Sequence, residues 1–346
     1  PRFINHQRRA RPTSRNLLIP CCFPAASLLL LPPAPVAMPR KGPPRGVSKA
    51  CHWLQARCHW LVATRSRRRA LVRIAFAVVL VPLVLQWALA YLLGSDARLL
   101  PPELLRAKNL LIVTAHPDDE CLFFAPSILG VLDRNHDVRG GLVVMSTGNN
   151  YGIGEQRKQE LHGSCVALGI DPTRCEALDD PDLQDNPTVW WDTAKIQVIL
   201  KDYVHKWDID AIITFDQGGL SGHINHRAVS AAVSEYALQD AKAPASYMVV
   251  TTALPRKYTF LLDLPLTALS FTWRIVAAIF FPSSTADPEY STKALVASTW
   301  HRYIKTREAF ASHGSQYTWD RHLYMVVSRY VWFNDLKRVA GREAPA

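Results

Sequence analysis

The sequence predicts an α/β protein with a Rossmann-like, doubly wound, mostly parallel sheet, preceded by one N-terminal transmembrane helix. From residue 109 onward, short apolar runs alternate with segments of helical periodicity, which is typical of parallel sheets. Two of these runs, 110–115 and 211–215, lead directly into polar, histidine-containing segments, as expected for ligand sites at the carboxyl edge of such sheets. Upstream, residues 74–95 are apolar, uncharged and long enough to cross a hydrocarbon core.

The N-terminal part carries most of the positive charge and is not expected to fold. Residues 1–73 hold 15 of the 40 lysines and arginines and none of the 29 acidic residues, so the rest of the chain is mildly acidic. No basic surface and no nucleic-acid partner are therefore expected for the folded part. Residues 1–70, rich in proline and arginine and beginning with Pro1, are expected to be disordered or an extension of the gene model, with Met38 as a candidate start.

Residues 74–95 are predicted to anchor the protein in a membrane. Five arginines at 65–73 flank the segment on one side, while Trp87 and Tyr91 lie towards its other end, as interfacial residues do. Pro82 is tolerated within a spanning helix. The alternative is a buried core helix, but the segment shows no amphipathic pattern.

A second apolar stretch covers residues 260–281. Asp263, Pro265 and Arg274 interrupt it, and charges are costly within a bilayer. We expect this stretch to lie on the membrane surface or to re-enter it, rather than to cross it.

The elements of the globular domain, residues 109–336, follow from the period of the apolar residues. Short apolar runs predict buried strands, and apolar residues three or four positions apart predict helices. Gly169 is expected to end one helix, and residues 288–335 are expected to be mostly helical. The predicted strands are 110–115, 142–146, 211–215 and 247–252, and the predicted helices are 120–134, 154–168, 190–207 and 225–238.

The segment His116-Pro117-Asp118-Asp119-Glu120 follows the first strand and precedes a helix. Three carboxylates and an imidazole crowd together here, which is costly unless a cation neutralises them. A histidine nitrogen and an aspartate oxygen suit zinc, so we predict His116 and Asp119 as ligands and Asp118 as a free general base. The alternative is an ordinary acidic helix start, favoured by the helix dipole.

A second cluster, residues 216–226, follows the third predicted strand and contains three glycines, His223 and His226. The histidines are three positions apart at a helix start, so one can complete a metal site while the other contacts the substrate. A pair of surface histidines is the alternative. His116, Asp119 and His226 with a water would form the open site of a catalytic zinc. Such a site suits amide hydrolysis, with His223 stabilising the oxyanion or protonating the leaving amine.

The two motifs together resemble those of the LmbE-like N-deacetylases, and in particular their membrane-bound eukaryotic branch, the N-acetylglucosaminylphosphatidylinositol de-N-acetylases. The resemblance covers about residues 109–336 and rests first on AHPDDE at 115–120 and SGHINH at 221–226. The sequence departs from the family pattern at 150–153 and in the tail at 312–324, which puts the substrate-facing role of the tail in doubt. Further matching stretches are STGN at 146–149, GEQRKQEL at 154–161, TFDQGG at 214–219, RKY at 256–258, LLDLP at 261–265, HGSQ at 313–316 and SRY at 328–330.

The resemblance implies an LmbE-type fold and a site for zinc, or another divalent metal, on His116, Asp119 and His226. It implies Asp118 as the general base and His223 as the residue that supports the transition state. The implied reaction is removal of the N-acetyl group from a glycolipid, N-acetylglucosaminylphosphatidylinositol, in the second step of GPI-anchor biosynthesis. Substrate binding is assigned to Asn149, Arg157, Arg256 and Lys257.

The resemblance also implies the endoplasmic reticulum membrane, with the domain on the cytosolic face. The positive-inside rule, applied to the arginines at 65–73, would instead put the domain in the lumen. Seven cysteines, an odd number without a CxxC pair, indicate a reduced compartment, no disulfide framework and no thiolate zinc site, which favours the cytosolic side. A deacetylase for a soluble amino sugar and a non-catalytic membrane scaffold are the alternatives.

Overall fold

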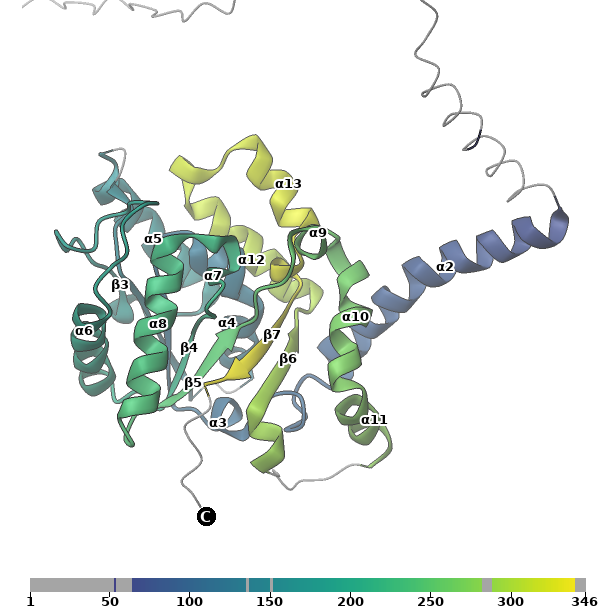
Figure 1. Ribbon diagram of the computed structural model, residues 1–346, viewed down its shortest axis with the longest axis horizontal. Helices are drawn as coiled ribbons and strands as arrows, with labels where there is room; N and C mark the ends of the chain where they lie inside the picture. The colour runs from purple at the N-terminus through teal and green to yellow at the C-terminus, as the bar shows by residue number, and fades with distance from the viewer. Residues whose placement is uncertain (1–52, 54–63, 135–136, 150–151, 282–287, 340–346) are drawn as a thin grey trace, which may run out of the picture. The chain divides into compact units, whose positions relative to one another are not determined.

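The computed structural model describes residue 53 and residues 64–134, 137–149, 152–281 and 288–339. Its centre is a seven-stranded sheet in the order β3-β2-β1-β4-β5-β7-β6 (Figure 1). The first five strands in this order are parallel, and β7 pairs antiparallel with both β5 and β6. The chain order reverses between β1 and β4, which is the switch point of a doubly wound sheet, so the predicted fold class is confirmed. The strands are β1 (Asn109–Thr114), β2 (Arg139–Val144), β3 (Cys175–Ala177), β4 (Ala211–Phe215), β5 (Ala245–Val249), β6 (Lys293–Ala297) and β7 (Phe333–Arg338).

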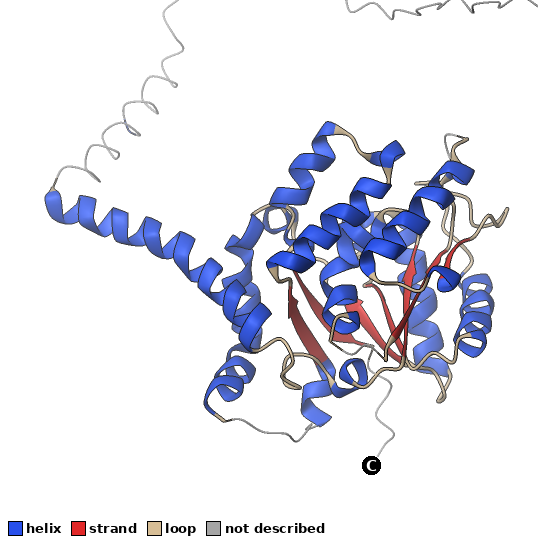
Figure 2. Cartoon of the chain, turned by 180° about the vertical axis from the view of Figure 1, so that it is seen from behind, coloured by secondary structure: helices blue, strands red, loops and turns tan. Residues whose placement is uncertain are grey.

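Helices cover both faces of the sheet (Figures 1 and 2). On one face, α8 (Ile224–Gln239) packs on β1, β4 and β5, with α6 (Thr193–Lys206) beside it. On the other face lie α4 (Ala125–Leu132), α5 (Gly154–Leu168) and α12 (Trp300–Ser312). The core lies between these layers, because β1 and β4 are buried on both sides as a central parallel strand requires. Short helices α3 (Pro102–Leu105), α7 (Gly219–Gly222), α9 (Leu254–Lys257) and α13 (Trp319–Val327) border the sheet.

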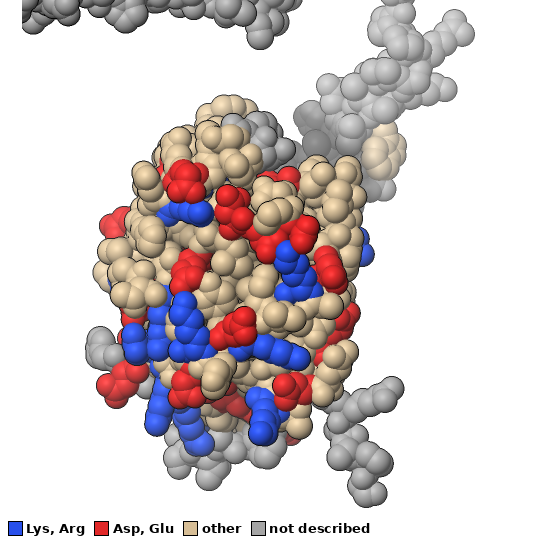
Figure 3. Space-filling model, turned by 90° about the vertical axis from the view of Figure 1, so that its left-hand side faces the viewer, with Lys and Arg blue, Asp and Glu red and all other residues tan. Residues whose placement is uncertain are grey.

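Basic and acidic side chains are interspersed on the face that includes α6 (Figure 3). On this helix, Lys195 pairs with Asp180 and Lys206 pairs with Glu176. The surface charge here is therefore mixed in sign.

Most predicted elements are confirmed, with ends that differ by a few residues. The prediction for α5 is correct at both ends, and Gly169 ends it in the left-handed conformation (φ 74°). The helix predicted at 120–134 begins as a π-helical turn, Glu120–Phe124, before α4. The prediction that 288–335 is mostly helical is wrong at β6 and at the start of β7, and the three-residue β3 was not predicted. Runs this short carry no decisive period, and only pairing with a neighbour makes them strands.

The prediction of a chain without disulfides is wrong, because Cys165 and Cys175 form one. The end of α5 crosses over the start of β3, which brings the two Cα atoms to 6.4 Å. Cys121 is a free, buried thiol, and the other four cysteines lie outside the described residues. The cysteine content therefore no longer favours the cytosolic orientation.

The N-terminal apolar segment forms α2 (Arg65–Trp87), continued by a π-helix, Ala88–Leu92. The helix thus begins inside the segment expected to be disordered, and residues before 64, apart from residue 53, lie outside the described part. Most apolar side chains of α2 are exposed, but Gln86 and Leu89 are buried. Gln86 Nε2 donates to the Ser298 carbonyl at 2.7 Å. The last turns of the predicted span therefore belong to the folded domain.

Residues 260–281 form a series of short helical segments, among them α10 (Leu264–Ala268) and α11 (Thr272–Phe280). Both charged residues of the 260–281 stretch, Asp263 and Arg274, are buried in the domain. Asp263 pairs with Arg329 at 2.5 Å and also with Arg256, while Arg274 donates to four backbone carbonyls. By length and composition, both Arg65–Leu92 and Phe260–Phe280 could cross a membrane. Membrane association of the second segment stays a prediction.

Candidate active site

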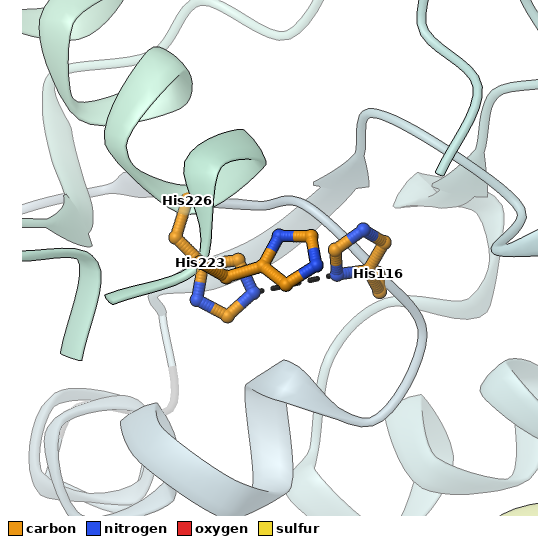
Figure 4. A group of neighbouring side chains, drawn as sticks. All are labelled: His116, His223 and His226. Atoms are coloured by element: carbon orange, nitrogen blue, oxygen red, sulfur yellow. Dashed lines mark hydrogen bonds between the residues drawn. The ribbon is translucent and has the colours of Figure 1, made fainter. Parts of the chain in front are cut away.

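The two motif loops meet at the carboxyl edge of the sheet, because they follow the paired strands β1 and β4. His116 comes from the loop after β1, His223 is the N-cap of α8, and His226 lies in the first turn of that helix. The three imidazole rings point toward one another (Figure 4), and a nitrogen from each lies within 4.8 Å of the others. The structure thus brings together the predicted ligand and transition-state histidines.

Acceptors on their outer sides indicate the tautomers of two of these histidines. His226 Nδ1 donates to the Gly219 carbonyl at 2.9 Å, and His116 Nε2 lies 3.2 Å from Asp185 Oδ1. The inner atoms, His226 Nε2 and His116 Nδ1, then carry lone pairs and face each other at 3.3 Å. Asp119 Oδ1 lies 3.3 Å from His226 Nε2. Three acceptors facing one another need a cation between them, so these residues fit a metal ion.

The charges around the site attract a cation. Burial lowers the pKa of His116, but the hydrogen bond to Asp185 and the charges of Asp119, Asp185 and Asp118 outweigh it, so this pKa is raised overall. Burial and the neighbouring His116 lower the pKa of His226 to about 3, which keeps His226 neutral. A site that draws a proton onto one ligand atom also draws a metal ion, which competes with that proton.

The two aspartates of the first motif have different positions. Asp119 Oδ2 accepts the backbone N–H groups of Ala115 and His116 at 3.2 and 2.8 Å, which leaves Oδ1 facing His226. Asp118 has a strained backbone (φ 115°), a feature that clusters at functional sites. Burial and the charge of Asp119 raise the pKa of Asp118 to about 6. Asp118 is therefore a carboxylate able to accept a proton near neutral pH.

Arg157 and Asn149, both predicted to bind substrate, support the loops around the site. Arg157 is buried and donates to the carbonyls of Pro117 and Gly148 at 2.5 and 3.2 Å. Gly148 has a positive φ of 66°, and a Cβ atom there would lie 2.1 Å from Arg157 Nη1. Asn149 Oδ1 accepts the Gly154 N–H at 2.9 Å and so holds the start of α5. Arg157 Nη2 also lies 3.7 Å from Asp118 Oδ1, beside the reacting groups.

Arg256 and Lys257 lie on α9 and have different surroundings. The Arg256 guanidinium is paired with the buried Asp263 and also donates to Thr267 Oγ1 at 3.2 Å. Lys257 Nζ donates to the carbonyl of Leu220, a strained residue (φ 57°) of the second motif loop. Of the two, Lys257 lies at the edge of the candidate site.

Two residues near the histidines were not predicted. Asp185 lies in the loop between β3 and α6, 3.2 Å from His116 Nε2 and 3.8 Å from His223 Nε2. Trp191, fully buried, has its ring 6.0 Å from that of His116. The signal was a run of aspartates at 179, 180, 182 and 185. Because β3 was not recognised, nothing indicated that this loop reaches the carboxyl edge.

Comparisons with known proteins find relatives of this chain. The family model for GlcNAc-PI de-N-acetylase matches residues 111–237. The N-acetylglucosaminyl-phosphatidylinositol de-N-acetylase of Bos taurus is 37% identical over 260 residues, which cover 73% of this chain and 94% of that protein. A probable enzyme of the same name from Schizosaccharomyces pombe is 32% identical, over 68% and 89% of the two chains. The solved structure of N,N'-diacetylchitobiose deacetylase from Pyrococcus horikoshii is 16% identical in sequence, with a TM-score of 0.38. The match covers 56% of this chain and 77% of that chain.

Proposed function

The chain belongs to the GlcNAc-PI de-N-acetylase family, and on that premise we propose that it hydrolyses the acetamide of N-acetylglucosaminyl-phosphatidylinositol. The products are acetate and glucosaminylphosphatidylinositol, which corresponds to the second step of GPI-anchor biosynthesis. One observation in this chain carries the proposal. Three metal-type acceptor atoms converge at the switch point of the sheet, with Asp118 adjacent to them in the chain.

The metal site consists of His116, Asp119 and His226. A bound zinc ion would lower the pKa of a water molecule to about 7 and polarise the acetyl carbonyl. Another divalent metal could replace zinc, because affinity alone does not select it. Asp185 and the Gly219 carbonyl orient the two imidazoles through their outer nitrogens.

The chain's own groups move the protons. Asp118 accepts a proton from the water as the water oxygen bonds to the acetyl carbon. His223 Nδ1 accepts the Asn225 N–H at 3.3 Å, so a neutral His223 keeps its proton on Nε2. Burial and the neighbouring histidines lower the pKa of His223, which favours this neutral form. Its Nε2–H can donate a hydrogen bond to the developing oxyanion. Protonation of the amine by His223 would need the imidazolium form, so the proton that Asp118 took from the water passes to the nitrogen as the C–N bond breaks.

Substrate contacts are predicted for Asn149, Arg157, Arg256 and Lys257. Support is strongest for Lys257, beside the second motif loop, and for Arg157, beside Asp118. It is weakest for Arg256, whose charge the buried Asp263 already balances. Contacts that hold the sugar and phosphate would position the amide and so raise turnover.

A glycolipid substrate requires the enzyme to work at a membrane. The exposed apolar residues of α2 and of the 260–281 segment support membrane attachment, and the pathway of the relatives supports the endoplasmic reticulum. We place the catalytic domain on the cytosolic face, following the family. The arginines at 65–73 favour the opposite orientation.

The test is deacetylation of N-acetylglucosaminyl-phosphatidylinositol by the purified full-length protein, before and after treatment with a chelator. We expect release of acetate and free amine, loss of activity with the chelator, and recovery when zinc is returned. Free N-acetylglucosamine, assayed in parallel, should react with an efficiency lower by several orders of magnitude. Equal efficiency on both compounds would favour a soluble amino sugar as substrate, and no turnover of either would refute the proposed activity.

A further inference from the structure

A pocket next to the candidate metal site is lined, apart from Lys257, by groups to which the proposed mechanism gives no role. It has a volume of about 130 Å³ and lies between the second motif loop, α9 and α13 (Figure 1). Phe123 and Ser221 form the wall that it shares with the metal site. The rings of Phe123 and His226 are 6.0 Å apart, and Ser221 Oγ lies 3.1 Å from His226 Nδ1. A ligand in this pocket therefore reaches the edge of the metal site.

The pocket suits an anion. Lys257 and Arg321 line it, whereas none of its described lining residues is a carboxylate. The Arg321 side chain forms no hydrogen bond or ion pair with any described residue, so all of its N–H donors are available. Lys257 Nζ donates one of its three N–H groups to the Leu220 carbonyl, which leaves two donors for a ligand. The hydroxyls of Tyr324 and Tyr330 already donate to backbone carbonyls, so the two cations, with Tyr258 beside them, determine what binds.

The helix that carries Arg321 has an exposed apolar face. Trp319, Leu323 and Val326 recur at helical spacing along α13 and are 80%, 56% and 47% exposed. Across the pocket, Leu254 of α9 is 66% exposed. A helix with such an apolar face can lie in a membrane interface, with its polar groups level with lipid headgroups. The pocket would then open at the depth of a lipid phosphate.

We infer that this pocket binds the phosphodiester of the lipid-linked substrate, with Arg321 and Lys257 as its cationic ligands. The inference rests on the proposed function, since it assigns another part of the same substrate. A phosphodiester carries one negative charge, and its oxygens accept hydrogen bonds from guanidinium and ammonium groups. The amino sugar and the inositol separate this phosphate from the acetamide, so its subsite belongs beside the metal site and not within it. Arg256 takes no part, because Asp263 holds it.

Three substrates distinguish the contribution of the phosphate from that of the acyl chains. They are N-acetylglucosaminyl-phosphatidylinositol, its deacylated glycerophosphate form, and N-acetylglucosaminyl-inositol without phosphate. We expect Arg321→Gln in the full-length enzyme to lower kcat/KM for both phosphate-bearing substrates roughly 10- to 100-fold more than for the phosphate-free one, as loss of a charged hydrogen bond predicts. Arg321→Lys should recover part of this ratio. Arg106→Gln, at an exposed arginine just before β1 at the opposite edge of the sheet, is the matched control and should leave the ratio unchanged.

The ratio of efficiencies decides the outcome. An unchanged ratio in Arg321→Gln, or an equal loss on all three substrates, would overturn the phosphate subsite. A loss confined to the acylated substrate would also overturn it, because Arg321 would then act through the membrane surface. If the unmodified enzyme deacetylates none of the three compounds, the proposed function fails. If it deacetylates them with no preference for the phosphate, the activity stands and the subsite alone is refuted.

Discussion

Two histidine–carboxylate clusters lie close together among the described residues, and in one of them the metal-type acceptor atoms face one another. The first, also buried but called the open cluster because its acceptor atoms face one another, consists of His116, Asp119 and His226. The buried pair consists of Glu120 and His313, whose Oε1 and Nε2 atoms are 2.7 Å apart with both side chains fully buried. Burial raises the pKa of Glu120, but the charge and hydrogen bond of His313 outweigh it and lower this pKa overall. Glu120 in turn raises the pKa of His313.

The difference shows that hydrogen-bond partners, rather than residue types, decide which cluster needs a cation. In the open cluster, outer partners take the histidine N–H groups and leave acceptors facing one another. In the buried pair, a proton lies between the imidazole and the carboxylate, so the charges balance without a metal. Cys121 is adjacent, but burial raises its pKa well above the ordinary value, so it is a thiol and not a thiolate ligand. Glu120 Oε2 also accepts the Asp118 N–H at 3.0 Å, which links the pair to the proposed general base.

The largest effect is expected at the open cluster. His226→Ala removes one of the three facing acceptors and should abolish both bound metal and turnover. Metal content measured by elemental analysis, together with the acetate assay, checks this. His205→Ala, at an exposed histidine of α6, is the control and should change neither. Full metal content in His226→Ala would refute the ligand assignment.

Next in size is Asp118→Asn. This change keeps the shape of the side chain but removes its ability to accept a proton, so the rate should fall roughly 10²- to 10⁴-fold. Metal content and substrate KM should stay close to those of the unmodified enzyme. Asp202→Asn on the exposed side of α6 serves as the matched control. If Asp118→Asn loses its metal, Asp118 is a metal ligand, and Asp119 becomes the candidate for the general base.

The buried pair should affect stability and leave metal binding intact. His313→Ala leaves the Glu120 charge buried without its partner, so the free energy of unfolding should fall by about 3–5 kcal/mol. Denaturant unfolding measures this loss, and His162→Ala on the exposed side of α5 is the control, with an expected change within about 0.5 kcal/mol. Loss of metal from the folded His313→Ala protein would refute the assignment of a purely structural role to the Glu120–His313 pair.

The smallest catalytic effect is expected at α2, the predicted membrane helix, which supplies a residue to neither cluster. Removal of residues 1–84 should release the protein from membranes, while turnover of a water-soluble substrate changes by less than about twofold. The deletion stops before Gln86 and Leu89 because both are buried in the domain. Sedimentation with membranes and a soluble-substrate assay test this. A truncated protein that still sediments would move the anchoring role to residues 260–281.

The first half of the domain was predictable because its signals are local. β4 and α5 have the predicted bounds, since each is a complete apolar run or helical period that ends at turn residues. Strands β6 and β7 were not distinguished from helix, because their place in the sheet depends on antiparallel pairing with partners distant in the sequence.

The residues of the candidate site also divide into those that local sequence signals could place and those that they could not. The two motif loops could be placed together because the carboxyl ends of neighbouring parallel strands share one edge. Asp185 and Arg321 could not be placed, since they lie in a loop after an unrecognised three-residue strand and on a helix near the end of the chain. Arg256 and Lys257 are adjacent in the sequence, yet one pairs with Asp263 and the other with the motif loop.

The sequence by itself determined the α/β alternation, the apolar N-terminal helix and the residue types at the two motif loops. These features are local, because they follow from hydrophobic period and from positions directly after strands. Tertiary structure alone decided which nitrogen of each histidine faces inward, that Glu120 pairs with His313, that Cys165 bonds with Cys175, and that Arg321 reaches the pocket. Each of these four features depends on a partner residue from another helix, strand or loop. The packing of helices on the sheet, rather than separation along the chain, sets the distance between such partners.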